Sequence, residues 1–302
     1  MLVNLGQPTI VGIGEILWDL LPDEKRLGGA PSNFAYHAKV LGAHAVIVSA
    51  VGNDELGLEA LESLDRLEID RTGVAIDPSH ATGTASVELT GNGIPSYRIA
   101  ENCAWDFIEW QPRLSRMAAD ADAVCFGSLS QRSAASRDTI RRFIRSTTPS
   151  CKRIFDINLR QEFYTRDCVE ESLKLANVLK LNDEELAMLT DTLSLSGSAT
   201  RCMDEILRRY SLELVALTRG AHGSVIVTSG QTVECPGFPT QVEDTVGAGD
   251  AFTAALVTGL LAGRELREIN AHACRIAALA CSHKGAMPQH PSETVDKLQF
   301  RQ

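Results

Sequence analysis

Short apolar runs rich in β-branched residues alternate with segments of helical periodicity through most of the chain. Such alternation is typical of a mostly parallel sheet with helices on both faces. The runs predicted to form buried strands are Thr9–Gly14, Ala45–Val51, Ala123–Gly127, Arg153–Ile157 and Val178–Leu181. The segments predicted to form helices between them lie near residues 31–41, 133–146, 167–176 and 183–190. The pattern therefore predicts an α/β fold built on one central sheet.

The pattern changes in the last third of the chain, where strands follow one another closely. The runs Leu214–Thr218, Ser224–Thr228 and Thr232–Cys235 have no helical segment between them, which fits an antiparallel edge on the sheet. The uncharged run Ala251–Gly263 and a segment near residues 265–283 are predicted to be the last two helices.

Two segments do not fit the alternation. Glu15–Leu27 and Thr84–Ile99 look like short strands joined by polar turns, and the second contains Gly91-Asn92-Gly93 and Pro95. We predict that residues of about 15–30 and 82–104 form a small separate sheet. Since no linker is long enough to divide the chain, this sheet is expected to be inserted into a single domain of residues 1–302.

The composition of the 302 residues, 44% hydrophobic and 23% charged, is that of an ordinary globular protein. No stretch approaches the roughly 18 apolar residues that a membrane span requires. The first residues lack the basic and apolar regions of a secretory signal, and the eight cysteines include no C-x-x-C pair, so we expect reduced thiols and a cytoplasmic location.

The formal net charge of −10 argues against a nucleic-acid-binding protein, which would need a basic face. It does not argue against a nucleotide ligand, because main-chain amides and one metal ion can hold phosphates within an acidic protein.

The stretch Asp244–Asp250, of sequence Asp-Thr-Val-Gly-Ala-Gly-Asp, directly precedes the long uncharged run. Its glycines let main-chain N–H groups approach a ligand, and a helix that begins there leaves its first amides unpaired. The helix dipole adds partial positive charge, so the stretch predicts an anion site for a phosphoryl group. Asp250 lies where a base could take a proton from an attacking hydroxyl. The alternative is a Gly-rich loop whose acidic residue merely favours the dipole.

A second cluster, Gly28-Gly29-Ala30-Pro31-Ser32-Asn33, precedes another predicted helix. The paired glycines permit a ligand to approach closely, and Pro31 suits a first helical turn. Asn33 fits either a ligand-binding role or a helix cap.

Together the two clusters resemble the paired signatures of the ribokinase-like (PfkB) carbohydrate kinases, and within them the sugar kinases of fructokinase type. The resemblance covers nearly the whole chain, because other parts of the family pattern follow in the expected order. They are Gly14-Glu15 with Asp19, Gly52–Gly57, Asp156–Arg160, Asn182–Glu185, Thr218–Gly223 and Gly285-Ala286.

The resemblance implies a Rossmann-like core whose small sheet acts as a lid over a sugar. It also implies ATP-dependent phosphorylation of a primary hydroxyl on a free sugar, with D-fructose as the first expectation. The acceptors 2-keto-3-deoxygluconate, ribose, another ketose or a nucleoside stay open. A sugar-binding regulator without catalysis is the alternative from a different class.

Roles in catalysis and sugar binding follow from the same resemblance. Asp250 would be the general base, and the amides around Gly247, Ala248 and Gly249 would stabilise the charge that develops on the phosphoryl group. The residues expected to contact the sugar are Asp19, Gly28, Gly29, Asn33, Tyr97 and Arg160. For Arg160, an ion pair with Asp156 or Glu162 fits equally well, and Tyr97 and Trp105 could instead pack the lid.

Roles in nucleotide and metal binding are also implied. Asn182 and Glu185 would organise Mg²⁺ and its waters, although Asn182–Glu185 also looks like a capped helix start. The residues Thr218, Gly220 and Gly223 would form a nucleotide loop, and without the resemblance they read as a hairpin turn. Asp244 would help to build a site for a monovalent cation such as K⁺ through nearby carbonyl groups.

The strands of the predicted lid present unpaired edges, which favours pairing with a second copy. We therefore expect a homodimer formed through the lid, with ATP and a sugar as the other partners and neither nucleic acid nor membrane among them.

Overall fold

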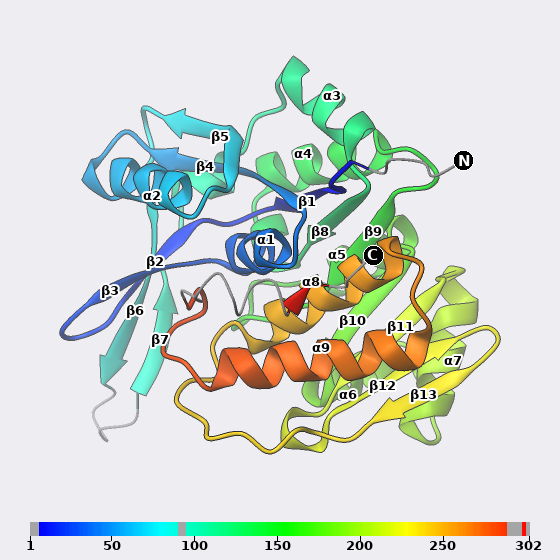
Figure 1. Ribbon diagram of the computed structural model, residues 1–302. Helices are drawn as coiled ribbons and strands as arrows, with labels where there is room; N and C mark the ends of the chain where they lie inside the picture. Colours follow the sequence, from blue (N-terminus) through cyan, green and yellow to red (C-terminus); the bar gives the residue numbers. More distant parts are fainter. Residues whose placement is uncertain (1–5, 90–94, 289–297, 300–302) are drawn as a thin grey trace.

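A nine-stranded sheet forms the centre of the computed structural model, which describes residues 6–89, 95–288 and 298–299 (Figure 1). The strand order is β13-β12-β11-β10-β9-β8-β1-β4-β5. In chain order the strands are β1 (Thr9–Ile13), β4 (His44–Gly52), β5 (Asp70–Asp77), β8 (Ala123–Phe126), β9 (Lys152–Asp156), β10 (Val178–Asn182), β11 (Leu214–Thr218), β12 (Ser224–Thr228) and β13 (Thr232–Cys235).

Every neighbouring pair from β5 to β11 is parallel, whereas β12 runs antiparallel to both β11 and β13. Parallel strands place their carboxyl ends at one edge of the sheet, where ligands bind in open α/β folds. The predicted fold class, with its antiparallel edge, is confirmed.

Successive side chains of each strand point to opposite faces of the sheet. Both faces carry buried apolar side chains, and helices cover both of them. Ile10, Ile154 and Val178 pack on one face with α1 (Ala30–Val40), α2 (Glu55–Arg66), α8 (Ala248–Leu261) and α9 (Leu266–Cys281). Their neighbours Val11, Phe155 and Leu179 pack on the other. The helices on that second face are α3 (Pro112–Asp120), α4 (Ala134–Arg145), α5 (Arg166–Leu175), α6 (Asp183–Thr192) and α7 (Ala199–Tyr210).

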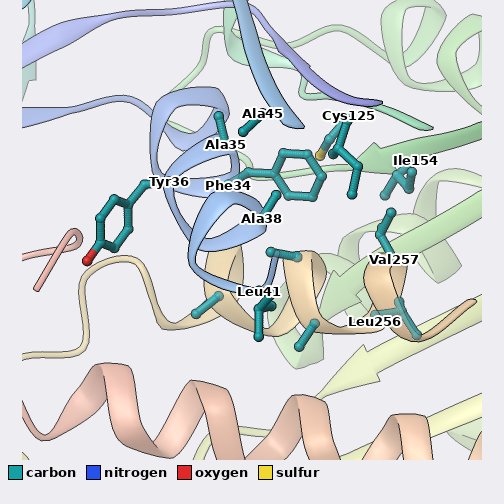
Figure 2. Close-up of a cluster of buried hydrophobic side chains, with 14 of the residues drawn as sticks. Phe34, Ala35, Tyr36, Ala38, Leu41, Ala45, Cys125, Ile154, Leu256 and Val257 are labelled. Atoms are coloured by element: carbon teal, nitrogen blue, oxygen red, sulfur yellow. The ribbon is translucent and has the colours of Figure 1, made fainter. Parts of the chain in front are cut away.

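Helix α8 lies between α1, α9 and the sheet, and every residue from Ala251 to Gly259 is buried. An uncharged sequence suits a helix that is covered all round. Figure 2 shows Phe34 of α1 directed toward Cys125 of the sheet, while Leu256 and Val257 of α8 lie in the same cluster. The two helices that begin at the predicted ligand clusters are thus packed against each other.

A second sheet of four strands stands at the side of the core, in the order β3-β2-β6-β7. It consists of β2 (Leu17–Leu20), β3 (Lys25–Gly28), β6 (Gly83–Leu89) and β7 (Pro95–Ile99). The two segments that do not fit the alternation therefore pair with each other through β2 and β6. The predicted turn Gly91-Asn92-Gly93 lies outside the described residues. We call this sheet the lid.

Four α-helices and β-strands of the structure have no counterpart among the predicted elements: α2, β5, α3 and α7. All three helices have a strongly polar outer face and low mean hydropathy, so their apolar residues do not form a conspicuous run. Strand β5 lies at the edge of the sheet and alternates only weakly between buried and exposed residues. The helical spacing of the apolar residues was the signal that could have predicted the three helices, whereas β5 offers little local pattern.

Candidate active site

Helix α8 begins in the predicted glycine turn. Gly247 is its N-cap and has a left-handed backbone with φ of 79°, a conformation that favours glycine. A Cβ atom at this position would lie 2.6 Å from Cβ of Ala286. The amides of Gly249 and Asp250 donate to no described residue, whereas the amide of Ala248 donates to the carbonyl of Thr245 at 3.3 Å. The turn is partly exposed and therefore leaves a helix N-terminus open to an anion.

Asp250, in the first turn of α8, is joined to the first helix of the chain. Asn33 Nδ2 donates to Asp250 Oδ2 at 2.8 Å. Asn33 lies inside α1, which begins at Ala30 after the N-cap Gly29, so the helix-cap interpretation of Asn33 is wrong. Its side chain instead connects the two predicted ligand clusters.

The carboxyl group of Asp250 is surrounded by protein although the residue is partly exposed at the turn. Burial raises its pKa to about 7, and the negative charge of Asp156 adds to this shift. The hydrogen bond from Asn33 and the charges of Lys180 and Arg160 act in the opposite direction. A carboxylate with a pKa near neutrality is suited to accept a proton at physiological pH.

Lys180 is the site residue that the sequence analysis missed. Its side chain, 8% exposed, extends from the middle of β10 and forms a 3.0 Å ion pair with Asp156 at the end of β9. Asp156 also accepts a hydrogen bond from Thr253 of α8 at 2.8 Å. A Cβ atom on Gly249 would lie 2.9 Å from Lys180 Nζ, so the ammonium group lies directly under the glycine turn. A single lysine in an otherwise apolar strand was the available signal, because a buried charge needs a partner.

Asp19 of the lid strand β2 lies against Gly28 of β3, where a Cβ atom would come within 2.6 Å of Asp19 Oδ2. Burial raises the pKa of Asp19, while the positive charges of Arg160 and Arg26 oppose the shift. The charge of Arg160 also lowers the pKa of Asp250. Arg160 is exposed and donates to the carbonyl of Leu159, and Asp156 pairs with Lys180 rather than with Arg160. Asp19, Arg160 and Asp250 therefore belong to one electrostatic neighbourhood.

Gly29 allows the chain to pass the carbonyl of Glu15, since a Cβ atom there would lie 2.4 Å from that oxygen. Its φ of 102° also favours glycine. The carboxyl group of Glu15 accepts a hydrogen bond from Ser130, and burial raises its pKa. This contact fastens the start of the lid to the core.

The predicted nucleotide residues lie at the carboxyl edge of the sheet. Asn182 of β10 is in register with Thr218 of β11, whose hydroxyl donates to the carbonyl of Leu181. Gly220 and Gly223 have φ of 52° and 83° in the tight turn between β11 and β12, two antiparallel strands. The hairpin interpretation of this turn is confirmed, and contact with a nucleotide stays a prediction.

Asn182 and Glu185 form a capping box at the start of α6. Asn182 Oδ1 accepts from the Glu185 amide at 2.9 Å, and Glu185 Oε2 accepts from the Asn182 amide at 2.8 Å. Glu185 Oε1 accepts from the amide of Leu159. The capped-helix interpretation is therefore confirmed. Since both oxygens are engaged and the side chain is buried, Glu185 suits contact with a cation through water better than direct ligation.

The charges nearby favour such a cation. Lys180 lies among the carboxylates of Asp156, Glu185 and Asp250. Burial lowers the pKa of Lys180, but the three negative charges together outweigh burial and raise the pKa. Burial raises the pKa of Glu185, and the charge of Asp156 adds to that effect. No three of the described acidic, histidine or cysteine side chains are grouped so that they could ligate a metal ion directly, so these charges fit Mg²⁺ only as an ion that keeps its waters and is carried with phosphates.

Asp244, at the start of the glycine turn, has its carboxylate engaged on both oxygens. Oδ1 accepts from the amide of Val246 at 3.0 Å, and Oδ2 accepts from the amide of Gly285 at 3.0 Å and from Arg26 at 3.1 Å. Because both oxygens already accept hydrogen bonds, the predicted monovalent cation would have to bind main-chain carbonyls around Asp244 rather than the carboxylate itself.

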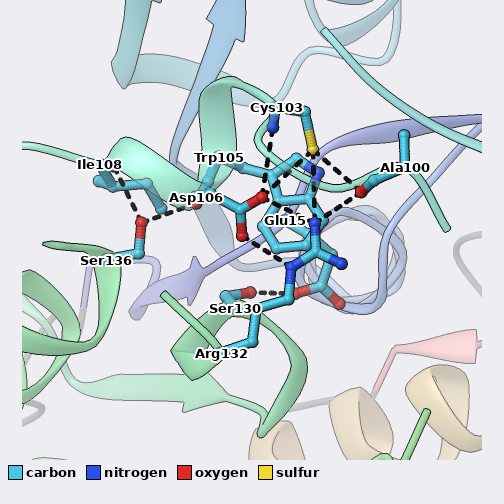
Figure 3. A network of polar contacts seen from close by, with 9 residues as sticks. All are labelled: Glu15, Ala100, Cys103, Trp105, Asp106, Ile108, Ser130, Arg132 and Ser136. Atoms are coloured by element: carbon cyan, nitrogen blue, oxygen red, sulfur yellow. Dashed lines mark hydrogen bonds and ion pairs between the residues drawn. The ribbon is translucent and has the colours of Figure 1, made fainter. Parts of the chain in front are cut away.

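Tyr97 lies in β7, and its side chain falls outside the described residues. Trp105, which follows the lid, is fully buried under it with Leu17 and Ile99, so it packs the lid. Figure 3 shows Arg132 forming two hydrogen bonds with Asp106, at 2.8 and 2.7 Å, and bonding the carbonyl of Ala100. This network anchors the return of the lid to the start of α4.

A cavity of about 440 Å³ lies beside Arg132 and Tyr164, and none of the predicted site residues lines it. The candidate reaction centre therefore rests on the contacts of Asp250, Asn33 and Lys180 and not on this cavity. At that centre, unpaired amides can bind a phosphoryl group while an adjacent carboxylate accepts a proton.

The model of the pfkB family carbohydrate kinases matches residues 23–293, which include the lid strand β3, the glycine turn and α8. This chain belongs to the pfkB family. It is a carbohydrate kinase, which transfers a phosphoryl group to an alcohol.

The curated relatives of this chain align with almost its whole length. It is 31% identical to a protein of Pyrococcus horikoshii named as a sugar kinase, over 94% of this chain and 93% of the relative. It is also 31% identical to the fructokinase of Escherichia coli, over 92% of this chain and 95% of the relative.

Solved structures agree with the family. The Pyrococcus horikoshii sugar kinase in complex with ATP has a TM-score of 0.78 at 30% identity, covering 92% of this chain and 94% of that one. A fructokinase from Vibrio cholerae, with fructose, ADP and calcium bound, has a TM-score of 0.80 at 25% identity, covering 97% and 99%. Among the described residues, none of the helices has the length and apolar character of a membrane span, and all eight cysteines are free thiols.

Proposed function

We propose that this pfkB kinase is a fructokinase that transfers the γ-phosphoryl group of ATP to a primary hydroxyl of D-fructose. The observation that carries the proposal is the bond between Asn33 and Asp250 beside the open amides of α8. It brings a candidate base, a polar side chain from the sugar cluster and a phosphate-binding turn to one point. Relatives named fructokinase, at 30 and 31% identity, support fructose as the acceptor.

Asp250 takes the proton of the attacking hydroxyl in this mechanism. Asn33 keeps the carboxylate oriented, because its amide donates to Oδ2 and leaves Oδ1 for the sugar. Asp19 accepts hydrogen bonds from other sugar hydroxyls, and the lid excludes water from the reacting groups. Phosphoryl transfer depends mainly on positioning and electrostatics, so few side chains need to take part chemically.

The developing charge on the phosphoryl group is stabilised by the amides of Gly249 and Asp250 and by the dipole of α8. Lys180 adds a positive charge beneath the same turn. Mg²⁺, held through water by Glu185 and Asn182, would neutralise phosphate charge when bound. Val242, just before the turn, and Val246, within it, are 59% and 45% exposed, and such exposed apolar side chains suit contact with the adenine ring.

A monovalent cation near Asp244 is a further part of the proposal. Titrating activity with KCl against choline chloride at constant ionic strength tests it. Activation by K⁺ would support a site formed by carbonyl groups around the turn. Activity that does not respond to K⁺ would contradict this site.

The proposed homodimer would form through the lid, whose outer strands β3 and β7 end the four-stranded sheet. Equilibrium sedimentation at micromolar concentration should show a dimer, and only monomer would contradict it. A cytoplasmic location also belongs to the proposal, and the free thiols support it.

A panel of sugars tests the acceptor. Fructose, ribose, 2-keto-3-deoxygluconate and a nucleoside are each incubated with ATP and Mg²⁺, and ADP release is measured with the Asp250→Asn variant as the blank. We expect the highest kcat/KM for fructose. A higher value for another acceptor would replace fructose, and no turnover with any acceptor would favour a regulator without catalysis.

A further inference from the structure

The lid strand β3 carries Arg26 next to Asp19, the carboxylate that we assign to sugar binding. In the antiparallel pair of β2 and β3, Asp19 lies opposite Arg26. Residues directly opposite in such a pair point to the same face of the sheet. The charge of Arg26 is one of the two that oppose the raised pKa of Asp19. Arg26 therefore belongs to the face of the lid that we assign to the sugar.

Arg26 also reaches out of the lid to the glycine turn. Its Nη1 donates to Asp244 Oδ2 at 3.1 Å, across 218 positions of sequence. The stem of Arg26 passes over Gly285, where a Cβ atom would lie 3.4 Å from its Cδ. Figure 1 shows β3 and the loop after α9 on the same side of the molecule.

The Asp244 carboxylate joins three parts of the site. It accepts from Arg26 of the lid, from the amide of Val246 just before the α8 N-cap, and from the amide of Gly285 in the loop after α9. Ala286, the next residue in that loop, packs against Gly247. Arg26 therefore contacts the same carboxylate that holds the backbone of the phosphate-binding turn.

The strength of the ion pair suits a contact that forms and breaks. The side chains of Arg26 and Asp244 are 27% and 20% exposed, so water weakens the pair without screening it fully. Arg26 has a second partner in the more exposed Glu24. The guanidinium group can therefore keep a partner when the lid moves away from the turn.

We propose that Arg26 is a positioning residue that couples the sugar-binding lid to the phosphate-binding turn through Asp244. The coupling rests on the proposed sugar site at Asp19. When a sugar holds the lid in place, Arg26 holds Asp244 and thereby the amides of Val246 and Gly285. Binding of the sugar and of the nucleotide should consequently favour each other, and by linkage the effect is equal in both directions.

The direct test measures how much the bound nucleotide increases the affinity for the sugar, which we call the synergy of binding. The Kd of the sugar that the panel selects is measured by calorimetry, with and without a non-hydrolysable ATP analogue. We expect the analogue to tighten sugar binding about fivefold or more in the wild type, the usual lower range for coupled sites. In Arg26→Gln this difference should fall to less than about twofold, and Arg26→Lys should keep part of it.

Lys25→Gln is the matched control, because Lys25 is the next residue of β3 and pairs with Glu59 of α2 rather than with the turn. It removes the same charge and should leave the synergy unchanged. Asp244→Asn should lose as much synergy as Arg26→Gln, and the double variant should lose no more than either one. Wild-type synergy in Arg26→Gln, equal loss in Lys25→Gln, or additive losses in the double variant would overturn the coupling.

Hydrogen exchange of the ligand-free protein separates this inference from the proposed acceptor. Peptides that contain Val246 and Gly285 should exchange faster in Arg26→Gln than in the wild type or in Lys25→Gln, because Asp244 loses its anchor. Unchanged exchange would contradict the coupling even if fructose is the substrate. Faster exchange would support it even if the panel selects another sugar.

Discussion

Asn33 donates its Nδ2 hydrogen to Oδ2 of Asp250 at 2.8 Å and so ties the first helix of the chain to the eighth. The two residues are separated by 217 positions. The hydrogen bond requires an ionised or accepting carboxyl oxygen, which favours the charged form of Asp250 against the effects of burial and of Asp156. The site thus holds a carboxylate whose affinity for a proton is set by several named neighbours.

The pH dependence of kcat/KM should report Asp250. Its pKa is raised from 3.8 to about 7, so the fraction of ionised base increases as the pH rises through 7. We expect kcat/KM to fall about tenfold per pH unit below that value and to level off above it. The measurement is a profile from pH 5.5 to 8.5 in buffers of constant ionic strength. A flat profile would contradict the assignment of Asp250 as the base.

Lys180 and Asp156 should move that profile in opposite directions. Lys180→Met removes a positive charge that lowers the pKa of Asp250, so the acidic limb should shift to higher pH. Asp156→Asn removes a negative charge that raises the pKa, so the limb should shift to lower pH. Pre-steady-state or initial-rate profiles of both variants provide the measurement. Shifts of the same sign would show that the charges do not act on Asp250 as described.

Lys180→Met should also destabilise the fold, because it leaves Asp156 buried without its ionic partner. Breaking a buried pair in this way typically costs about 3–5 kcal/mol. Urea unfolding compares this variant with Lys152→Gln, which breaks the exposed pair of Lys152 with Glu213 and should cost less than about 1 kcal/mol. Equal effects of the two variants would count against a buried pair.

Gly247→Ala should disturb the glycine turn. A side chain here would have to adopt φ of 79° and would meet Cβ of Ala286 at 2.6 Å. The left-handed conformation alone costs roughly 1–2 kcal/mol. We expect lower stability in urea unfolding and a raised KM for ATP. Gly230→Ala is the control, since nothing lies within 4 Å of the added Cβ atom, and loss of ATP binding in both variants would remove the argument.

Local sequence pattern predicted the central sheet because its strands are buried on both faces. Ala123–Phe126 and Leu214–Leu217 are continuous apolar runs, and both are buried in the structure. The glycine turn and Asp250 were also predictable, since backbone conformation and a helix start restrict the residues that fit there. By contrast, α2 and α7 contain no continuous apolar run, and only the helical spacing of their apolar residues could have predicted them.

Contacts between segments that are far apart in the sequence cannot be predicted from the local sequence pattern. Nothing local pairs Lys180 with Asp156, places the ammonium group under Gly249, or brings Arg26 of the lid to Asp244. The sequence also left Asn33 undecided between a cap and a ligand-binding residue, because both interpretations need only its distance from a predicted helix start. The structure excludes the cap, because α1 begins at Ala30, and shows that Asn33 bonds Asp250, while contact with a ligand stays a prediction.

The turnover of Asp250→Asn tests the central claim most directly. An asparagine at this position keeps an oxygen that can accept the hydrogen bond from Asn33, so the change removes the base with little disturbance of the fold. With ATP and the preferred sugar, we expect kcat to fall by at least about a hundredfold while the KM of the sugar changes less than about threefold. Turnover at the wild-type rate would contradict the account.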